Sequence, residues 1–342
     1  MPVLRNRAVF DLARGVRAFF GFEAGLTRAE ALVPENDEIQ NLHRLAAEKA
    51  AEIERLEKEV AASVGRTDGV DPENIVWIFG VARVGSTWLA SMMGETEGLT
   101  VWNEPRVGSL LGNFYYGRGA HRGGKHGILG GPDEKRSRAI RAFILASAHE
   151  KFPEVSGDGY LVVKEPNGSN GAPLLAQALP ESRMIFLVRD PRDVASSGIG
   201  AASEGGWYAE TRKRRGGASK EQSPDDIVEA RSKRYVEFIG RSKEAYQAHR
   251  GPKVLVKYEE LRADTLGTMK RMYSGLGISV EEDEVARAVE KHSWENIPEE
   301  KKGPDKFYRK ATPGGWREDL TPEQVRVIER ITAPFIEEFY SA

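Results

Sequence analysis

The chain has 342 residues, a length that allows one large domain or two ordinary ones. Its formal net charge is −2 although 30% of its residues are charged, so no overall field draws it to nucleic acid. It has no cysteine, and its 6 histidines show no metal-ligand spacing, which excludes disulfides and cysteine nucleophiles and predicts no catalytic metal. Without a run of about 18 apolar residues, no transmembrane helix is predicted, and we expect a cytoplasmic protein.

The first 64 residues predict a helical extension. Residues 1–25 place apolar side chains at helical spacing between arginines, which fits a helix packed on the protein, with peripheral membrane contact as the alternative. Residues 36–63 follow a heptad, typical of a coiled coil that would make a homodimer, although a single helix packed on its own domain fits equally. Residues 65–72 form a polar linker, so the main domain is expected over 73–342.

Residues 74–89 predict a strand, a tight turn and a helix start, because an apolar run gives way to small residues and then to helical spacing. Such a turn directs several backbone N–H groups at one place, where they bind an anion, usually a phosphate. Gly85 allows close backbone approach, and Arg83 adds a positive charge. The stretch lacks the Gly-Lys-Ser/Thr of a Walker A loop, and an ordinary turn with a solvated Arg83 is the alternative.

A second stretch of this kind begins with an apolar run that ends at Arg189. Asp190 fits a helix N-cap and Pro191 the first helical turn, with Ser197 about two turns further on. Two anion-binding turns, each after a strand, suggest a ligand with two separate anionic groups.

The remaining elements alternate between strand and helix. Further strands are predicted at 98–104, 160–165 and 253–261, and helices at 134–151, 174–179 and 225–249. The glycine-rich residues 108–133 predict a mobile loop over a site, and the chain after 261 should be helical apart from a loop at 296–316. This alternation predicts an α/β fold: a three-layer sandwich with a central parallel sheet of about five strands. Ligands bind beyond the carboxyl ends of such strands.

Together the two stretches resemble the sulfotransferase family, which has a P-loop-like fold and uses 3′-phosphoadenosine 5′-phosphosulfate (PAPS). Residues 82–89, ARVGSTWL, are similar to the family's loop P-[KR]-[SV]-G-[ST]-T-[WL]-L, which holds the 5′-phosphosulfate. Residues 189–197, RDPRDVASS, are similar to R-[ND]-P-[RK]-D-x-x-x-S, which holds the 3′-phosphate. Residues 309–317 resemble R-K-G-x-x-G-x-W-[KR], with Ala311 in place of a glycine. The resemblance covers residues 74–317.

This resemblance implies a donor site without a metal. Its residues would be Arg83, Val84, Gly85, Ser86, Thr87, Trp88, Arg189, Ser197, Tyr258, Ser293, Trp294, Arg309 and Lys310. The aromatic members would contact the adenine, although for Tyr258 packing in the core is an equal alternative.

The implied reaction is in-line transfer of a sulfuryl group to an acceptor hydroxyl, with Arg83 neutralising the departing phosphate oxygen. Family members that act on small phenols and steroids use a histidine base, but this chain has Lys164-Glu165 at that place. Members that act on sugars and protein tyrosine use a glutamate after the second strand, which matches Glu104. We therefore expect Glu104 as the base, with a pKa raised by burial, and Lys164 as an electrostatic contact. Glu165 is the rival base, and an ion pair with Arg106 is the structural alternative for Glu104.

A glutamate base favours a carbohydrate, glycolipid or other small-molecule hydroxyl as the acceptor. Two alternatives remain open: a P-loop-type nucleotide kinase, or a non-catalytic scaffold that keeps the nucleotide-binding fold. Neither the Gly-Lys-Ser/Thr nor the magnesium-binding aspartate of a kinase is evident in the sequence.

Overall fold

The computed structural model describes residues 70–117, 127, 129–155, 157–202, 223–303 and 312–340, with residues 44, 45, 47–49, 51, 52 and 55. The chain divides into two compact units, Met1–Arg66 and Thr67–Ala342. The predicted amphipathic helix at 1–25 and most of the predicted coiled coil lie outside the described residues, so both stay predictions. Within the described parts of the chain, no helix has the length and apolarity needed to cross a membrane.

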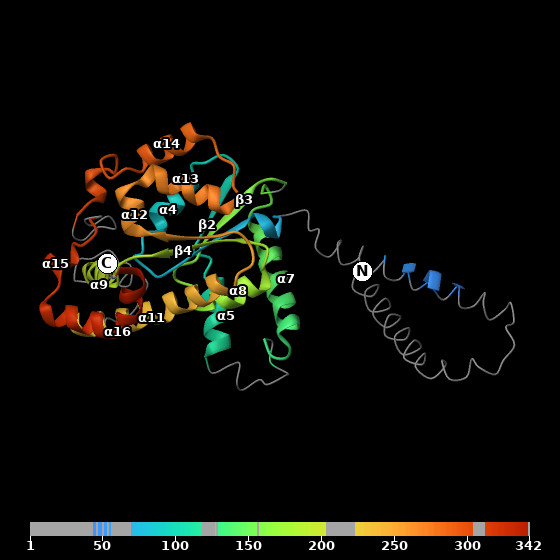
Figure 1. The fold of residues 1–342 in the computed structure, drawn as a ribbon, viewed down its shortest axis with the longest axis horizontal. Helices are drawn as coiled ribbons and strands as arrows, with labels where there is room; N and C mark the ends of the chain where they lie inside the picture. The colour runs from blue at the N-terminus through green and yellow to red at the C-terminus, as the bar shows by residue number, and fades with distance from the viewer. Residues whose placement is uncertain are drawn as a thin grey trace. The chain divides into compact units, whose positions relative to one another are not determined.

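A five-stranded sheet forms the centre of the second unit, and every strand pair in it is parallel (Figure 1). Its strands are β1 (Ile75–Phe79), β2 (Leu99–Asn103), β3 (Tyr160–Lys164), β4 (Arg183–Val188) and β5 (Lys253–Lys257), in the order β2-β3-β1-β4-β5. The central strand β1 consists of β-branched and aromatic residues and is buried along its whole length. The predicted parallel sheet is therefore confirmed, and its strand order brings the two predicted anion-binding turns, after β1 and β4, side by side.

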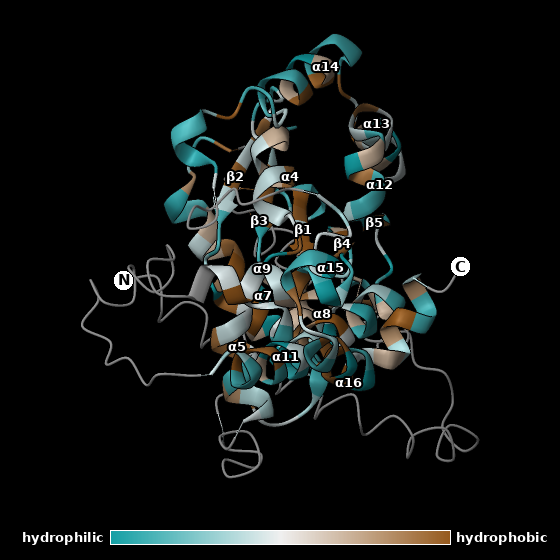
Figure 2. Cartoon of the chain, turned by 90° about the vertical axis from the view of Figure 1, so that its left-hand side faces the viewer, coloured by the Kyte–Doolittle hydropathy of each residue, from teal (hydrophilic) through white to brown (hydrophobic). Residues whose placement is uncertain are grey.

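Helices cover both faces of the sheet. They are α4 (Ser86–Met93), α5 (Val107–Tyr116), α7 (Asp133–Lys151), α8 (Ala172–Ala178), α9 (Pro191–Ala202), α11 (Pro224–Ala248), α12 (Tyr258–Ala263), α13 (Thr265–Leu276), α14 (Glu282–Lys291), α15 (Trp316–Asp319) and α16 (Pro322–Tyr340), with short 3-10 helices η2 (Pro72–Asn74), η4 (Ser169–Gly171) and η5 (Glu299–Lys301). Figures 1 and 2 show α4, α13 and α14 on one face and α5, α8 and α11 on the other.

Alternate residues of β1 enter different hydrophobic cores. Val76 and Ile78 pack in one core with α4 and α13, whereas Trp77 and Phe79 pack in the other with α7 and α8. This alternation follows from the pleat of a strand, which sends successive side chains to opposite faces. The apolar strands lie between helices whose outer faces are hydrophilic (Figure 2). The expected three-layer sandwich is thus confirmed.

The glycine-rich residues 108–133 were expected to form a mobile loop. For residues 108–116 this prediction is wrong, because they belong to α5. Gly108 and Gly112 lie in the interior of α5. A Cβ on Gly108 would lie 2.1 Å from the carbonyl oxygen of Gly168, and one on Gly112 would lie 2.7 Å from the backbone nitrogen of Gly171. These glycines therefore allow two backbones to touch, which is a packing role. Residues 118–126 and 128 lie outside the described residues.

The fifth strand was expected to run to residue 261, but it ends at Lys257, and Tyr258 begins α12. Glu259 and Glu260 in the first turn of this helix interact favourably with its dipole, which favours a helix start there. The apolar residues 258 and 261 have helical spacing as well as fitting a strand, so the pattern alone was ambiguous.

Replacing Gly112 with Ala should destabilise the protein by about 1–2 kcal/mol, because an overpacking penalty of about 2–3 kcal/mol exceeds the gain of about 1 kcal/mol in helix propensity. Gly240 in α11 is a matched control, since its added Cβ would meet only the Phe335 ring, at an ordinary 3.7 Å. Gly240→Ala should therefore be neutral or stabilising. Urea unfolding of both variants measures the difference, and equal stabilities would contradict close packing at Gly112.

Candidate active site

The turn between β1 and α4 combines two unusual backbone conformations. Gly85 has a φ of 97° and Arg83 a φ of 74°, and both values lie in the left-handed region. That region is uncommon for a residue with a side chain, and residues held there tend to cluster at functional sites. The first turn of α4 follows, and its N–H groups have no partner within the helix. The turn thus has the form of an anion-binding nest.

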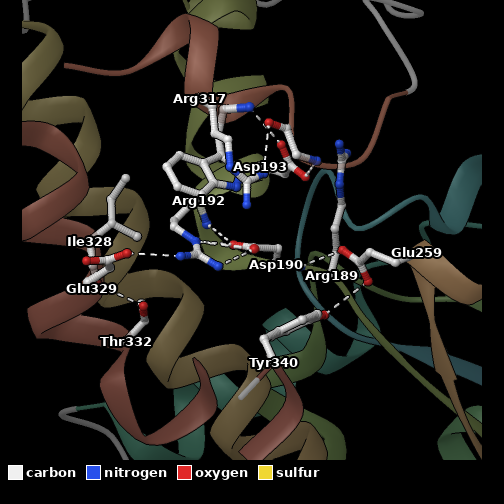
Figure 3. Close-up of polar contacts among 12 residues, drawn as sticks. Arg189, Asp190, Arg192, Asp193, Glu259, Arg317, Ile328, Glu329, Thr332 and Tyr340 are labelled. Carbon is white, nitrogen blue, oxygen red and sulfur yellow. Dashed lines mark hydrogen bonds and ion pairs between the residues drawn. The ribbon is translucent and has the colours of Figure 1, made fainter. Parts of the chain in front are cut away.

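The turn between β4 and α9 lies directly beside it. Asp190 accepts a hydrogen bond from the backbone N–H of Arg192 at 2.8 Å, which confirms the predicted N-cap (Figure 3). Arg83 donates from Nε to Ser197 Oγ at 2.9 Å, and Arg189 donates from Nη1 to the carbonyl oxygen of Arg83 at 3.1 Å. Two sequence segments about 100 residues apart are therefore joined by direct hydrogen bonds.

Tyr258, at the start of α12, packs between these two turns. A Cβ on Gly85 would lie 2.5 Å from the Tyr258 ring, and the guanidinium of Arg189 lies 4.3 Å from the ring centroid. Trp88 meets the same ring edge-on at 6.2 Å and donates from Nε1 to the carbonyl oxygen of His292 at 2.8 Å. This last bond holds the segment with Ser293 and Trp294 beside α4. Tyr258 is only 5% exposed, so it has a packing role whether or not it touches a ligand.

Glu104 follows β2, and Lys164 is the last residue of the neighbouring strand β3. Their side chains form an ion pair of 2.8 Å. The Lys164 ammonium, which is almost fully buried, also donates to Thr87 Oγ1 at 2.9 Å, and Glu104 accepts from Asn167 at 2.9 Å. Partial burial raises the pKa of Glu104, but the hydrogen bonds and the charge of Lys164 outweigh it, so the pKa lies below its ordinary value. The expected raised pKa is therefore wrong, and the ion-pair partner is Lys164 instead of Arg106.

Glu165, the rival base, has no exposed surface. Its Oε2 accepts from the backbone N–H of Arg106 at 3.0 Å and its Oε1 from that of Gly108 at 2.9 Å. Burial raises the pKa of this carboxyl to about 7. Both of its carboxylate oxygens thus accept hydrogen bonds from the turn that leads from Glu104 into α5. A general base needs an oxygen that can bind the acceptor hydroxyl, and both oxygens of Glu165 already bind backbone.

Asp193 is a site residue that the sequence did not reveal. Its Oδ2 accepts from Gly314 N at 2.7 Å and its Oδ1 from Trp316 N at 3.0 Å, which fixes the C-terminal turn against α9. Arg192 lies 4.4 Å over the Trp316 ring and pairs with Asp190 at 2.7 Å. Figure 3 shows Arg192 and Asp190 facing each other. Two signals in the sequence could have found it: Asp193 matches the second aspartate of the family pattern at residues 189–197, and it is an acidic residue in the first turn of a helix, which usually reflects the helix dipole.

Most of the predicted residues are therefore neighbours at the carboxyl edge of the sheet. The structure brings together Arg83, Val84, Gly85, Ser86, Thr87, Trp88, Glu104, Lys164, Arg189, Ser197 and Tyr258, and Trp88 is bonded to His292, the residue before Ser293 and Trp294. Arg309 and Lys310 lie outside the described residues. Within those residues, no group of three or more histidine, aspartate or glutamate side chains is arranged to hold a metal ion.

Comparison with known proteins gives one consistent result. The sequence model of the sulfotransferase family matches residues 76–282. Cytosolic sulfotransferase 17 of Arabidopsis thaliana is 25% identical over 334 residues, covering 84% of this chain and 91% of the relative. Sulfotransferase 2A6 of Rattus norvegicus is 26% identical over 168 residues, covering 44% of this chain and 55% of the relative.

Solved structures with some similarity include mouse sulfotransferase SULT7A1 complexed with PAP, at 16% identity and a TM-score of 0.47, covering 81% of this chain and 88% of that one. Sulfotransferase STF9 from Mycobacterium avium has 15% identity and a TM-score of 0.46, covering 79% of this chain and 77% of its own. The matched residues 76–282 make up more than half of the chain and include both predicted anion-binding turns, Glu104 and Lys164. The chain belongs to the sulfotransferase family.

Proposed function

We propose that this enzyme transfers a sulfuryl group from PAPS to an acceptor hydroxyl. The observation that carries the proposal is the junction of the two turns, in which Arg83 contacts Ser197 and Arg189 contacts the backbone of Arg83. PAPS carries anionic groups at the 5′ and 3′ positions of one adenosine. Two cationic turns in direct contact, with aromatic rings beside them, match that charge distribution.

In this proposal the donor occupies the joined turns. Backbone N–H groups of residues 85–87 hold the 5′-phosphate, and Arg189 and Ser197 hold the 3′-phosphate. Arg309 and Lys310 would complete the 3′-phosphate site, and Trp88, Tyr258 and Trp294 would contact the adenine. Asp193 supports this arrangement by fixing the turn at 314–316, which follows Arg309 and Lys310 in the chain.

Glu104 is the proposed base. The acceptor oxygen bonds to sulfur while the bond from sulfur to the 5′-phosphate oxygen breaks, and the acceptor proton passes to the Glu104 carboxylate. The low pKa of Glu104 means that the carboxylate is ionised at neutral pH, as a base must be. Lys164, which bridges Glu104 and Thr87, places its positive charge between the base and the donor turn, and Arg83 neutralises the departing oxygen.

The acceptor class that this site favours is a carbohydrate, a glycolipid or another aliphatic hydroxyl. The strand end that carries the histidine base in enzymes that act on phenols has no histidine here, and its one carboxylate, Glu165, is buried and bound to backbone. The remaining candidate base, Glu104, then defines where the acceptor oxygen must lie.

Calorimetric titration with adenosine 3′,5′-bisphosphate (PAP), beside adenosine 5′-monophosphate and magnesium ATP, tests the donor site. We expect micromolar binding of PAP, much tighter than the monophosphate, and a loss of about 10–100-fold on Arg189→Ala because charge-assisted hydrogen bonds to the 3′-phosphate disappear. Arg271→Ala is the control, since Arg271 is exposed and pairs with Asp264 in the loop before α13.

A preference for magnesium ATP over PAP would refute the proposal and favour a kinase. PAP binding without sulfuryl transfer from radiolabelled PAPS, to a panel of sugars, glycolipids and alcohols or to water, would favour a scaffold.

A further inference from the structure

We propose that Glu165 is a positioning residue for the reaction: its buried carboxylate holds the turn at residues 104–106 so that Glu104 stays against Lys164. The inference rests on the proposed function, because it takes Glu104 as the base. It assigns a task to a buried acidic group that the proposed reaction does not otherwise use.

The carboxylate of Glu165 is bound at both oxygens. The backbone N–H groups of Arg106 and Gly108 donate to it at 3.0 and 2.9 Å, so it caps the first turn of α5 from a neighbouring strand. Arg106, the N-cap residue of α5, makes no capping hydrogen bond with its own side chain. Glu165 therefore does for this helix what a capping side chain normally does.

The turn that Glu165 holds is strained. Glu104 has a φ of 51° and Arg106 a φ of 62°, on either side of Pro105, and neither is a glycine. Residues with side chains stay in the left-handed region only where their surroundings enforce it. Two hydrogen bonds that the backbone donates to a buried carboxylate provide such a constraint, and the resulting conformation directs Glu104 towards Lys164 and Asn167.

The backbone of Glu165 is hydrogen-bonded to β1 and to Ser169, which also binds the start of the donor turn. Its N–H donates to the carbonyl oxygen of Ile78 in β1 at 3.0 Å, and its carbonyl oxygen accepts from Ser169 Oγ at 3.0 Å. The same Ser169 oxygen accepts from the N–H of Gly80, where the donor turn begins, also at 3.0 Å. Glu165 thus connects the start of the donor turn to the turn that carries the base.

Glu165→Gln tests the proposal, because glutamine keeps the size of the side chain but presents one acceptor instead of two. At saturating PAPS we expect turnover to fall about 10–100-fold while PAP affinity stays within about twofold, since the donor turns are untouched. Turnover is measured as release of sulfate from radiolabelled PAPS, with water in place of the acceptor hydroxyl. Calorimetry with PAP gives the affinity, and thermal unfolding gives the stability.

The pH profile separates positioning from mere stability. Burial raises the pKa of Glu165 to about 7, and the charged groups that face it are Glu104, which raises the pKa, and Arg106, which lowers it. As the pH rises through this value the side chain becomes a carboxylate that accepts both N–H groups. Wild-type turnover should therefore rise from about pH 6 to 8, and Glu165→Gln should remove this rise.

Gly168→Ala is a second variant that leaves Glu165 chemically intact. Gly168 has a φ of −116°, which alanine tolerates, but its Cβ would lie 2.3 Å from Oε1 of Glu165 and displace the carboxylate. It should reproduce the loss of turnover, and it should add little to Glu165→Ala, where no carboxylate remains to be displaced.

Four outcomes are decisive. A lower melting temperature with unchanged turnover and pH profile would overturn the positioning role. Loss of PAP binding together with turnover would also overturn it, because the effect would then extend to the whole site. If wild-type protein binds no PAP, the proposed function fails; if wild type binds PAP and turns over PAPS but Glu165→Gln changes neither rate nor profile, only this inference fails.

Discussion

Glu104→Gln is expected to lower turnover by about 10²–10⁴-fold, the range typical for loss of a general base. Glutamine is close in size and cannot accept the acceptor proton at neutral pH. The two turns should stay joined, because the bonds between Arg83, Ser197 and Arg189 do not involve residue 104 and Lys164 can keep its hydrogen bond to Thr87. PAP affinity should therefore stay within about twofold. Sulfate release from radiolabelled PAPS and calorimetry with PAP measure the two quantities separately.

Glu181→Gln is the matched control for this experiment. Glu181 is also partly buried and also forms an ion pair, with Arg141, but it precedes β4 and so lies at the amino edge of the sheet. Its replacement should leave turnover unchanged. If Glu104→Gln turned over PAPS as fast as Glu181→Gln, Glu104 would not be the base. Glu165 would not inherit the role, because its two oxygens already bind the backbone of Arg106 and Gly108.

The sequence predicted the local structure of the two turns well because the information there is local. An apolar strand, a small-residue turn and a helix start follow one another within residues 74–89, and the cap at Asp190 depends only on residues next to it. A parallel sheet then places all its carboxyl strand ends at one edge, so Glu104, Lys164 and Arg189 were expected at the same edge of the sheet. Contacts within a few residues, together with one rule about sheets, were sufficient.

The errors arose where a residue's role depends on a distant segment. Gly108 and Gly112 suggested a flexible loop, yet they are needed because residues 168–171 press against α5. The pKa of Glu104 was expected to be raised by burial, but its environment is decided by Lys164 and Asn167, which come from another strand and the loop after it. Neither partner could be assigned from sequence spacing.

Glu165 shows the same limit and the reason for it. Its position beside Lys164 at a strand end suggested a catalytic role. In the structure its hydrogen bonds connect it to the turn before α5. An ionised carboxylate with no exposed surface is unfavourable in itself, as its raised pKa reflects. Proteins retain such groups where function depends on a precise local conformation, even though the buried charge lowers stability. The strained 104–106 turn is a conformation of that kind.

Gly85→Ala should weaken PAP binding by about 10²–10³-fold, because it displaces the backbone N–H groups proposed to hold the 5′-phosphate. Two effects combine at this position. The φ of 97° is unfavourable for alanine, and the new Cβ would lie 2.5 Å from Cδ2 of Tyr258. The ring has little room to move away, since it is 5% exposed and carries the Arg189 guanidinium 4.3 Å from its centroid. The donor turn must shift instead, and calorimetry with PAP measures the result.

Gly98→Ala isolates the backbone effect. Gly98 has a φ of 76°, but nothing lies within 4 Å of its added Cβ. This variant should lose about 1–2 kcal/mol of stability, the usual penalty for alanine in the left-handed region, and should bind PAP as the wild type does. A difference in PAP affinity between the two variants is then due to the place of Gly85 in the turn after β1 and its contact with Tyr258, and not to a left-handed alanine as such. Equal PAP affinities for Gly85→Ala and Gly98→Ala would mean that the turn after β1 does not hold the donor phosphate.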